Sequence, residues 1–173
     1  MTTKISKTLR ITDDSGFLGI VNADKYNSFV REDWQLPQLL ERFVDEMNND
    51  NLILWCTGSQ NNWTVHFASK PSGIKSFREF YKSLEVTSGK LFLTNYEDLS
   101  MAAQYQDEKI PAKHNAGLSI ELVNGLYEFQ IRQLFNPEDY NYDPEGKVNF
   151  EIVVRTDSNK KFQRVDNVFW QTH

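Results

Sequence analysis

The chain has 173 residues, and its 24 acidic against 19 basic residues give it a formal net charge of −5. This charge argues against a nucleic-acid-binding protein, because the average field of the protein repels a polyanion. Hydrophobic residues make up 39% of the chain and aromatic residues 13%, too many for a disordered protein. The length fits a single globular domain, residues 1–173, with one shared core.

The cellular compartment is indicated by the scarcity of cysteine. Cys56 is the only cysteine, so no disulfide can form within the chain. Small secreted domains commonly depend on disulfides, so we expect a reducing environment. The sequence shows neither a signal peptide nor an apolar run long enough to span a membrane. We therefore expect a cytoplasmic protein.

The first elements in chain order are a hairpin and a helix. Residues 7–22 alternate between apolar and polar on either side of a turn sequence at 13–16, which predicts a β-hairpin. Apolar residues recur at spacings of three and four over 35–49, and Pro37 stands near the start of this stretch. This pattern predicts an amphipathic helix.

The middle of the chain predicts more strands and a second helix. Residues 52–57 form a nearly continuous apolar run and residues 63–67 alternate strictly, so we expect two strands joined as a second hairpin. Apolar residues at helical spacing over 74–84 predict a short amphipathic helix. Residues 91–94 predict a further strand.

The stretch from 95 to 135 combines a cap, a loop and the strongest turn signal. Asn95 is suited to cap a helical turn over 96–105, whereas residues 106–117 lack periodicity and predict a loop. An Asn-Gly pair at 124–125 stands between alternating runs. Because both residues accept a positive φ, this pattern predicts a third hairpin over 118–135.

The last part of the chain predicts two more strands and completes the fold class. Residues 148–154 alternate, residues 157–160 resemble a turn, and residues 162–170 predict a final strand. Together these elements predict an α+β fold of predominantly antiparallel sheet, with about eight or nine strands, several hairpins and two or three short helices.

Catalytic motifs are missing from the sequence. It contains no glycine-rich phosphate loop, no nucleophile elbow and no histidine pair at metal-ligand spacing. We therefore predict no catalytic residue, metal or cofactor, and an enzyme is disfavoured. Cys56 lies in an apolar strand and is expected in the core, where His66 across the second hairpin is its one candidate base.

The sequence leaves one alternative function open. It is a small-ligand-binding protein or an enzyme with a site between the sheet and the helices. Its candidate residues are His66, Asp107, Glu108 and His114. For each histidine, a hydrogen-bonded or solvated side chain is the simpler interpretation.

Residues 136–146 carry acids and tyrosines but no base. Tyrosine provides rigid contact area and acids steer the encounter with a basic surface. We predict that this segment binds a partner protein through Glu138, Asp139, Tyr140, Tyr142, Asp143 and Glu145. The simpler alternative is a long solvated loop whose tyrosines pack back on the sheet.

In size, charge and composition the chain resembles small acidic bacterial proteins, among which are immunity proteins that neutralise toxins. No motif carries this likeness, so it identifies no family. The missing catalytic motifs and the acidic 136–146 loop are what favour a protein-binding module, immunity-like in neutralising a basic partner. Neither a nucleic acid nor a membrane is expected as a partner. A structural homo-oligomer is the third alternative.

Overall fold

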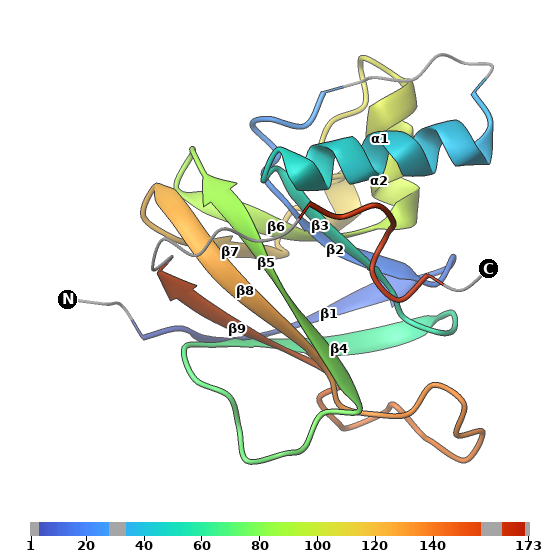
Figure 1. The fold of residues 1–173 in the computed structure, drawn as a ribbon, viewed down its shortest axis with the longest axis vertical. Helices are drawn as coiled ribbons and strands as arrows, with labels where there is room; N and C mark the ends of the chain where they lie inside the picture. The colour runs from blue at the N-terminus through green and yellow to red at the C-terminus, as the bar shows by residue number, and fades with distance from the viewer. Residues whose placement is uncertain (1–3, 28–33, 157–163, 172–173) are drawn as a thin grey trace.

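The computed structural model describes residues 4–27, 34–156 and 164–171, and Figure 1 shows the arrangement of the chain. Among these residues, nine strands form two sheets, accompanied by two α-helices and one short 3-10 helix. The predicted α+β fold with mostly antiparallel sheet is therefore confirmed. No helix in the described ranges has both the length and the apolar character needed to cross a membrane.

The five-stranded sheet has the order β1-β4-β9-β8-β5, and β4 and β9 are its one parallel pair. Its strands are β1 (Ser6–Asp13), β4 (Asn61–Ala68), β9 (Phe150–Thr156), β8 (Gly125–Gln133) and β5 (Arg78–Val86). The four-stranded sheet has the order β3-β2-β6-β7 and is antiparallel throughout. Its strands are β3 (Leu52–Cys56), β2 (Phe17–Val21), β6 (Lys90–Asn95) and β7 (Ser119–Glu121).

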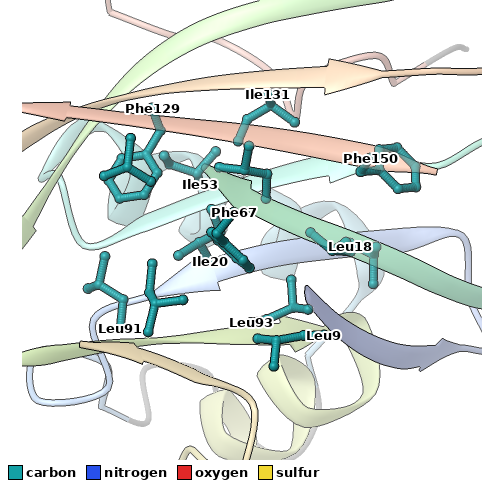
Figure 2. Close-up of a cluster of buried hydrophobic side chains, with 14 of the residues drawn as sticks. Leu9, Leu18, Ile20, Ile53, Phe67, Leu91, Leu93, Phe129, Ile131 and Phe150 are labelled. Atoms are coloured by element: carbon teal, nitrogen blue, oxygen red, sulfur yellow. The ribbon is translucent and has the colours of Figure 1, made fainter. Parts of the chain in front are cut away.

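The buried apolar side chains form two cores, so the expectation of one shared core is wrong. The first core lies between the two sheets, where side chains such as Leu18, Phe67 and Phe129 meet (Figure 2). The second lies between the four-stranded sheet and the helices. Strand β3 contributes side chains to both cores, because Trp55 belongs to the first and Leu54 to the second. This double burial explains its continuous apolar run.

None of the three predicted hairpins forms. Strands β1 and β2 lie in different sheets, and so do β3 and β4, and β7 and β8. The chain therefore crosses from one sheet to the other at each of these turns. Turns do lie at the predicted positions, but a turn between two stacked sheets uses the same residues as a turn within one sheet.

The predicted helix over 74–84 is also wrong, because β5 occupies much of this stretch. Phe80, Leu84 and Val86 alternate toward the core, and Lys82 stands between them. Lys82 is only 4% exposed, and its Nζ lies 3.0 Å from Oδ1 of Asp50. A buried charge at a core-facing position concealed the two-residue period of the strand.

The final predicted strand is only partly testable. Residues 157–163, which include the predicted turn, lie outside the described residues. Over the described residues 164–171 the chain forms a single parallel bridge, between Phe169 and Trp55 of β3, instead of a strand. The strand prediction for this part is therefore wrong.

The two helices begin near Pro37 and after Asn95, as the sequence predicts. Helix α1 (Leu36–Asn48) has Pro37 in its first turn, and helix α2 (Tyr96–Gln104) follows Asn95. Asn95 Oδ1 accepts a hydrogen bond of 2.9 Å from the backbone N–H of Asp98, which satisfies one of the free donors at the start of α2. The Asn95 cap and the position of Pro37 near the start of α1 are thus confirmed.

Glu46 of α1 has a partly buried carboxylate that accepts a hydrogen bond of 3.1 Å from Asn51 Nδ2. Burial raises the pKa of Glu46 above its usual value and outweighs the effect of this bond. A carboxyl whose pKa is raised by folding destabilises the fold once it is ionised. The free energy of unfolding therefore falls as pH rises from the ordinary glutamate pKa through the raised pKa. We expect Glu46→Gln to raise the melting temperature at neutral pH.

Thermal unfolding of both proteins over a pH series checks this expectation. The advantage of the glutamine variant is expected to disappear below the ordinary glutamate pKa, where both forms are uncharged. A variant no more stable than the native chain at neutral pH would contradict it.

Candidate functional site

The loop between β8 and β9 contains the predicted partner-binding residues, and it projects from the lower end of the five-stranded sheet in Figure 1. Its base is fixed by stacked aromatic rings. Trp63 of β4 stacks on Phe135 with ring centroids 5.1 Å apart, and Phe135 stacks on Tyr142 at 4.5 Å. Phe150 contacts Phe135 edge-on at 5.7 Å. This aromatic column joins the loop to the first core.

Two further contacts fix the same base. The buried side chain of Asn149 donates to the Tyr142 hydroxyl (2.8 Å) and accepts from the backbone N–H of Thr64 (2.7 Å). Gly58 has φ +98°, and a Cβ added there would lie 2.4 Å from Cβ of Pro137. Only glycine fits this close approach without displacing the start of the loop.

The acids of the loop order its backbone and also present charge to the solvent. Oδ1 of Asp139 accepts from the backbone N–H of Asn141, and Oδ1 of Asp143 accepts from that of Glu145, each at 3.0 Å. These local bonds order the backbone of the loop. The Glu145 carboxylate lies 3.4 Å from Arg10 of β1. Glu138 is exposed, as are Asp139 and Asp143.

Tyr140 stands between these acids and is 100% exposed, the highest value among the large hydrophobic side chains that the structure describes. Within those residues, none of the carboxylates of Glu138, Asp139 and Asp143 forms an ion pair with a lysine or arginine. The structure thus has an exposed tyrosine ring and unpaired carboxylates on a loop with a fixed base. Of the two predicted tyrosines, Tyr142 is part of that base and Tyr140 faces solvent.

Asp13 lies at the other end of the aromatic column and is 1% exposed. Its carboxylate accepts five hydrogen bonds, from the backbone N–H groups of Ser15, Gly16 and Phe17, the Thr57 hydroxyl and the Trp63 indole N–H. The sequence indicated the turn at this position. It gave no signal for the two side-chain donors, because they come from residues that are distant in the sequence.

Among the residues of the alternative ligand site, His66 lies in a different layer from the other three, which belong to the segment between α2 and β7. His66 of β4 is in the five-stranded sheet, where its Nδ1 lies 2.8 Å from the Thr8 hydroxyl. His114 lies beside α2, with Nε2 3.5 Å from Asp98 Oδ1. Asp107 and Glu108 are exposed on the segment after α2. In the described part of the chain, no three histidine, cysteine or acidic side chains are grouped so that they could hold a metal ion.

Cys56 is half-buried at the end of β3, and burial raises its pKa to about 11. Its thiol therefore stays protonated near neutral pH, which disfavours nucleophilic chemistry. The candidate pairing with His66 does not follow from the register, since Cys56 lies opposite Phe17 and His66 lies opposite Thr8.

No protein-family model matches the chain, and no curated protein matches it in sequence. Two solved structures share its fold. One is named crocagin biosynthetic gene J, with 11% identity over 90% of this chain and 99% of that chain and a TM-score of 0.58. The other is ComJ from Bacillus subtilis, an inhibitor of the DNA degrading activity of NucA, with 10% identity over 88% and 98% and a TM-score of 0.50. At these identities the likeness shows the fold alone.

Proposed function

We propose that this protein binds and inhibits another protein, and that the 136–146 loop docks on a basic surface of that partner. The observation that carries the proposal is the fully exposed ring of Tyr140 on a loop whose base is fixed to the core. An ordered loop loses little conformational entropy on binding, so more of its contact energy contributes to affinity. Exposed aromatic rings surrounded by charges are frequent centres of protein interfaces.

The fold likeness to ComJ supports the same class of function. ComJ inhibits the DNA degrading activity of NucA, and a DNA-degrading enzyme needs a positively charged surface to bind its substrate. The acids of the loop and the net charge of −5 suit such a partner, because complementary charge accelerates encounter and opposes wrong partners.

We expect a variant with Glu138, Asp139, Tyr140 and Asp143 replaced by alanine to bind its partner at least ~30-fold more weakly, since central interface residues each contribute about 2 kcal/mol or more. The partner is first captured from a lysate of the native host with the unmodified protein and identified. Its affinity for both versions is then measured by titration calorimetry. Phe135 and Tyr142 are kept so that the loop base stays intact.

The matched control is Asp107→Ala with Glu108→Ala. It removes exposed acids from a different loop and also tests the alternative ligand site. This control is expected to bind like the native chain. Equal affinity of the loop variant and the native chain would remove the loop from the interface, and equal loss in both variants would indicate attraction by overall charge alone.

A further inference from the structure

Helix α1 has two rows of apolar side chains, and only one of them is fully buried in the second core. Leu39, Phe43 and Met47 are completely buried. Leu40 and Val44 are only partly buried at the margin of that core. Leu36, one turn earlier on the same flank, is 50% exposed. Residues four apart share a helix face, so Leu36, Leu40 and Val44 form a partly exposed apolar line along α1.

The C-terminal segment 164–171 lies beside this line, and Figure 1 shows it passing close to α1. It is attached there by Asn48, whose side chain exchanges two hydrogen bonds with the backbone of Val165, at 3.0 and 2.9 Å. A cavity of about 390 Å³ lies between the helix and this segment. Its apolar lining comes from Pro37, Leu40, Val44 and Val165.

Among the described residues, the charged lining of this cavity is mainly acidic. Within those residues, Glu41, Asp45 and Asp166 contribute carboxylates and Arg164 is the one basic residue of the lining. Asp45 also lies 3.9 Å from Arg42, but both side chains are nearly half exposed, so this ion pair contributes little. The groove therefore combines an apolar floor with an acidic rim.

We propose that this groove docks an amphipathic helix of a partner, with leucine-like anchors in the cavity and lysine or arginine against the rim. The volume is within the range of binding pockets and holds a few side chains, as the anchors of a helix require. A line of apolar residues four apart matches a second helix laid along the first. The groove lies on a different element from the 136–146 loop, so this inference does not rest on the proposed function.

The test is an NMR titration of the full chain with a synthetic peptide of leucine and lysine, patterned as an amphipathic helix. We expect saturable shifts of the backbone amides of residues 40–45 and 164–167. A peptide of the same pattern with glutamate in place of lysine is expected to cause none, because its charge repels the rim. Shifts concentrated on residues 136–146, or shifts that never saturate, would overturn the proposal.

A double variant, Glu41→Lys with Asp45→Lys, is expected to weaken the leucine–lysine peptide at least ~10-fold, because like charges then face each other across the groove. The matched control, Asp107→Lys with Glu108→Lys, makes the same change of net charge on the exposed segment after α2 and is expected to leave the affinity for the peptide unchanged. Equal weakening in both would overturn the proposal in favour of non-specific attraction. If the Glu41→Lys with Asp45→Lys variant loses its helical circular dichroism signal, the variant Glu41→Gln with Asp45→Asn provides the same comparison with a smaller perturbation.

Discussion

Replacing Asp13 with alanine is expected to lower the free energy of unfolding by about 3–5 kcal/mol, since each buried donor left without a partner costs about 1–3 kcal/mol. Asp13 is 1% exposed and accepts five hydrogen bonds from groups that tie both sheets together. Water entering the space of the lost carboxylate is expected to satisfy some of these donors, which is why the losses do not add in full. Urea unfolding measures the change.

Asp14 provides the matched control, because it is the neighbouring acid in the same turn and is exposed. Asp14→Ala is expected to change the free energy of unfolding by no more than about 0.5 kcal/mol. The free energy of unfolding of Asp13→Asn is expected to lie between those of Asp13→Ala and Asp14→Ala. The amide keeps one acceptor oxygen but turns a donor group toward other donors. Similar stability of the Asp13→Ala and Asp14→Ala variants would show that the carboxylate is not needed.

The same change is expected to reach the candidate binding loop. Asp13 holds the indole of Trp63, and Trp63 stacks on Phe135, which stacks on Tyr142. Loss of the first contact is therefore expected to increase amide hydrogen exchange over residues 138–145 as well as to lower global stability. Faster exchange elsewhere but not in the loop would show that the aromatic column does not transmit the effect.

Local patterns predicted most strands and helix α1, because alternation and helical spacing are properties of neighbouring residues. They could not predict pairing. The turns at 13–16 and 124–125 have the composition of hairpin turns, yet each carries the chain from one sheet to the other. Which strand lies opposite is decided by how the two sheets stack, and no short segment contains that information.

Buried charges account for much of what the sequence concealed. Lys82 made β5 look irregular because a lysine on a core-facing position is rare, and only the nearby Asp50 explains it. The local sequence predicts Asp13 as a turn residue, but its burial depends on Thr57 and Trp63, which are distant in the chain. The acidic loop was found because its composition is local, whereas the aromatic column beneath it depends on Trp63, far away in the chain.

A second charged group, on the face of the five-stranded sheet away from the other sheet, is also buried, though less completely than Asp13. Arg132 of β8 lies directly opposite Glu151 of β9, and their side chains are 8% and 4% exposed. Arg132 also lies 3.3 Å from Glu79 and donates to the carbonyl of Ile74, while Glu151 accepts from the backbone N–H of Ser72. The pair thereby holds the connection between β4 and β5 against the sheet.

Glu151→Leu is expected to lower the free energy of unfolding by about 3 kcal/mol, because it leaves the Arg132 guanidinium buried without its nearest carboxylate. The value lies at the lower end of the usual range since Glu79 remains as a partial partner. Adding Arg132→Met is expected to restore most of the loss, because two apolar side chains of similar volume replace the ion pair. Chemical unfolding of the two single variants and the double variant gives the coupling energy.

The pH dependence separates this ion pair from simple packing. Burial alone raises the pKa of Glu151, but the backbone N–H and hydroxyl of Ser72 together with Arg132 outweigh it, and the pKa lies below its usual value. A lowered pKa stabilises the fold at every pH above the ordinary glutamate range, and this contribution is lost as pH falls through the lowered value. The difference between the native chain and Glu151→Leu should therefore be constant near neutral pH and shrink in acid, opposite in sign to the effect expected at Glu46. A difference that does not change with pH would mean that the loss comes from packing, because packing does not depend on the protonation of the Glu151 carboxyl.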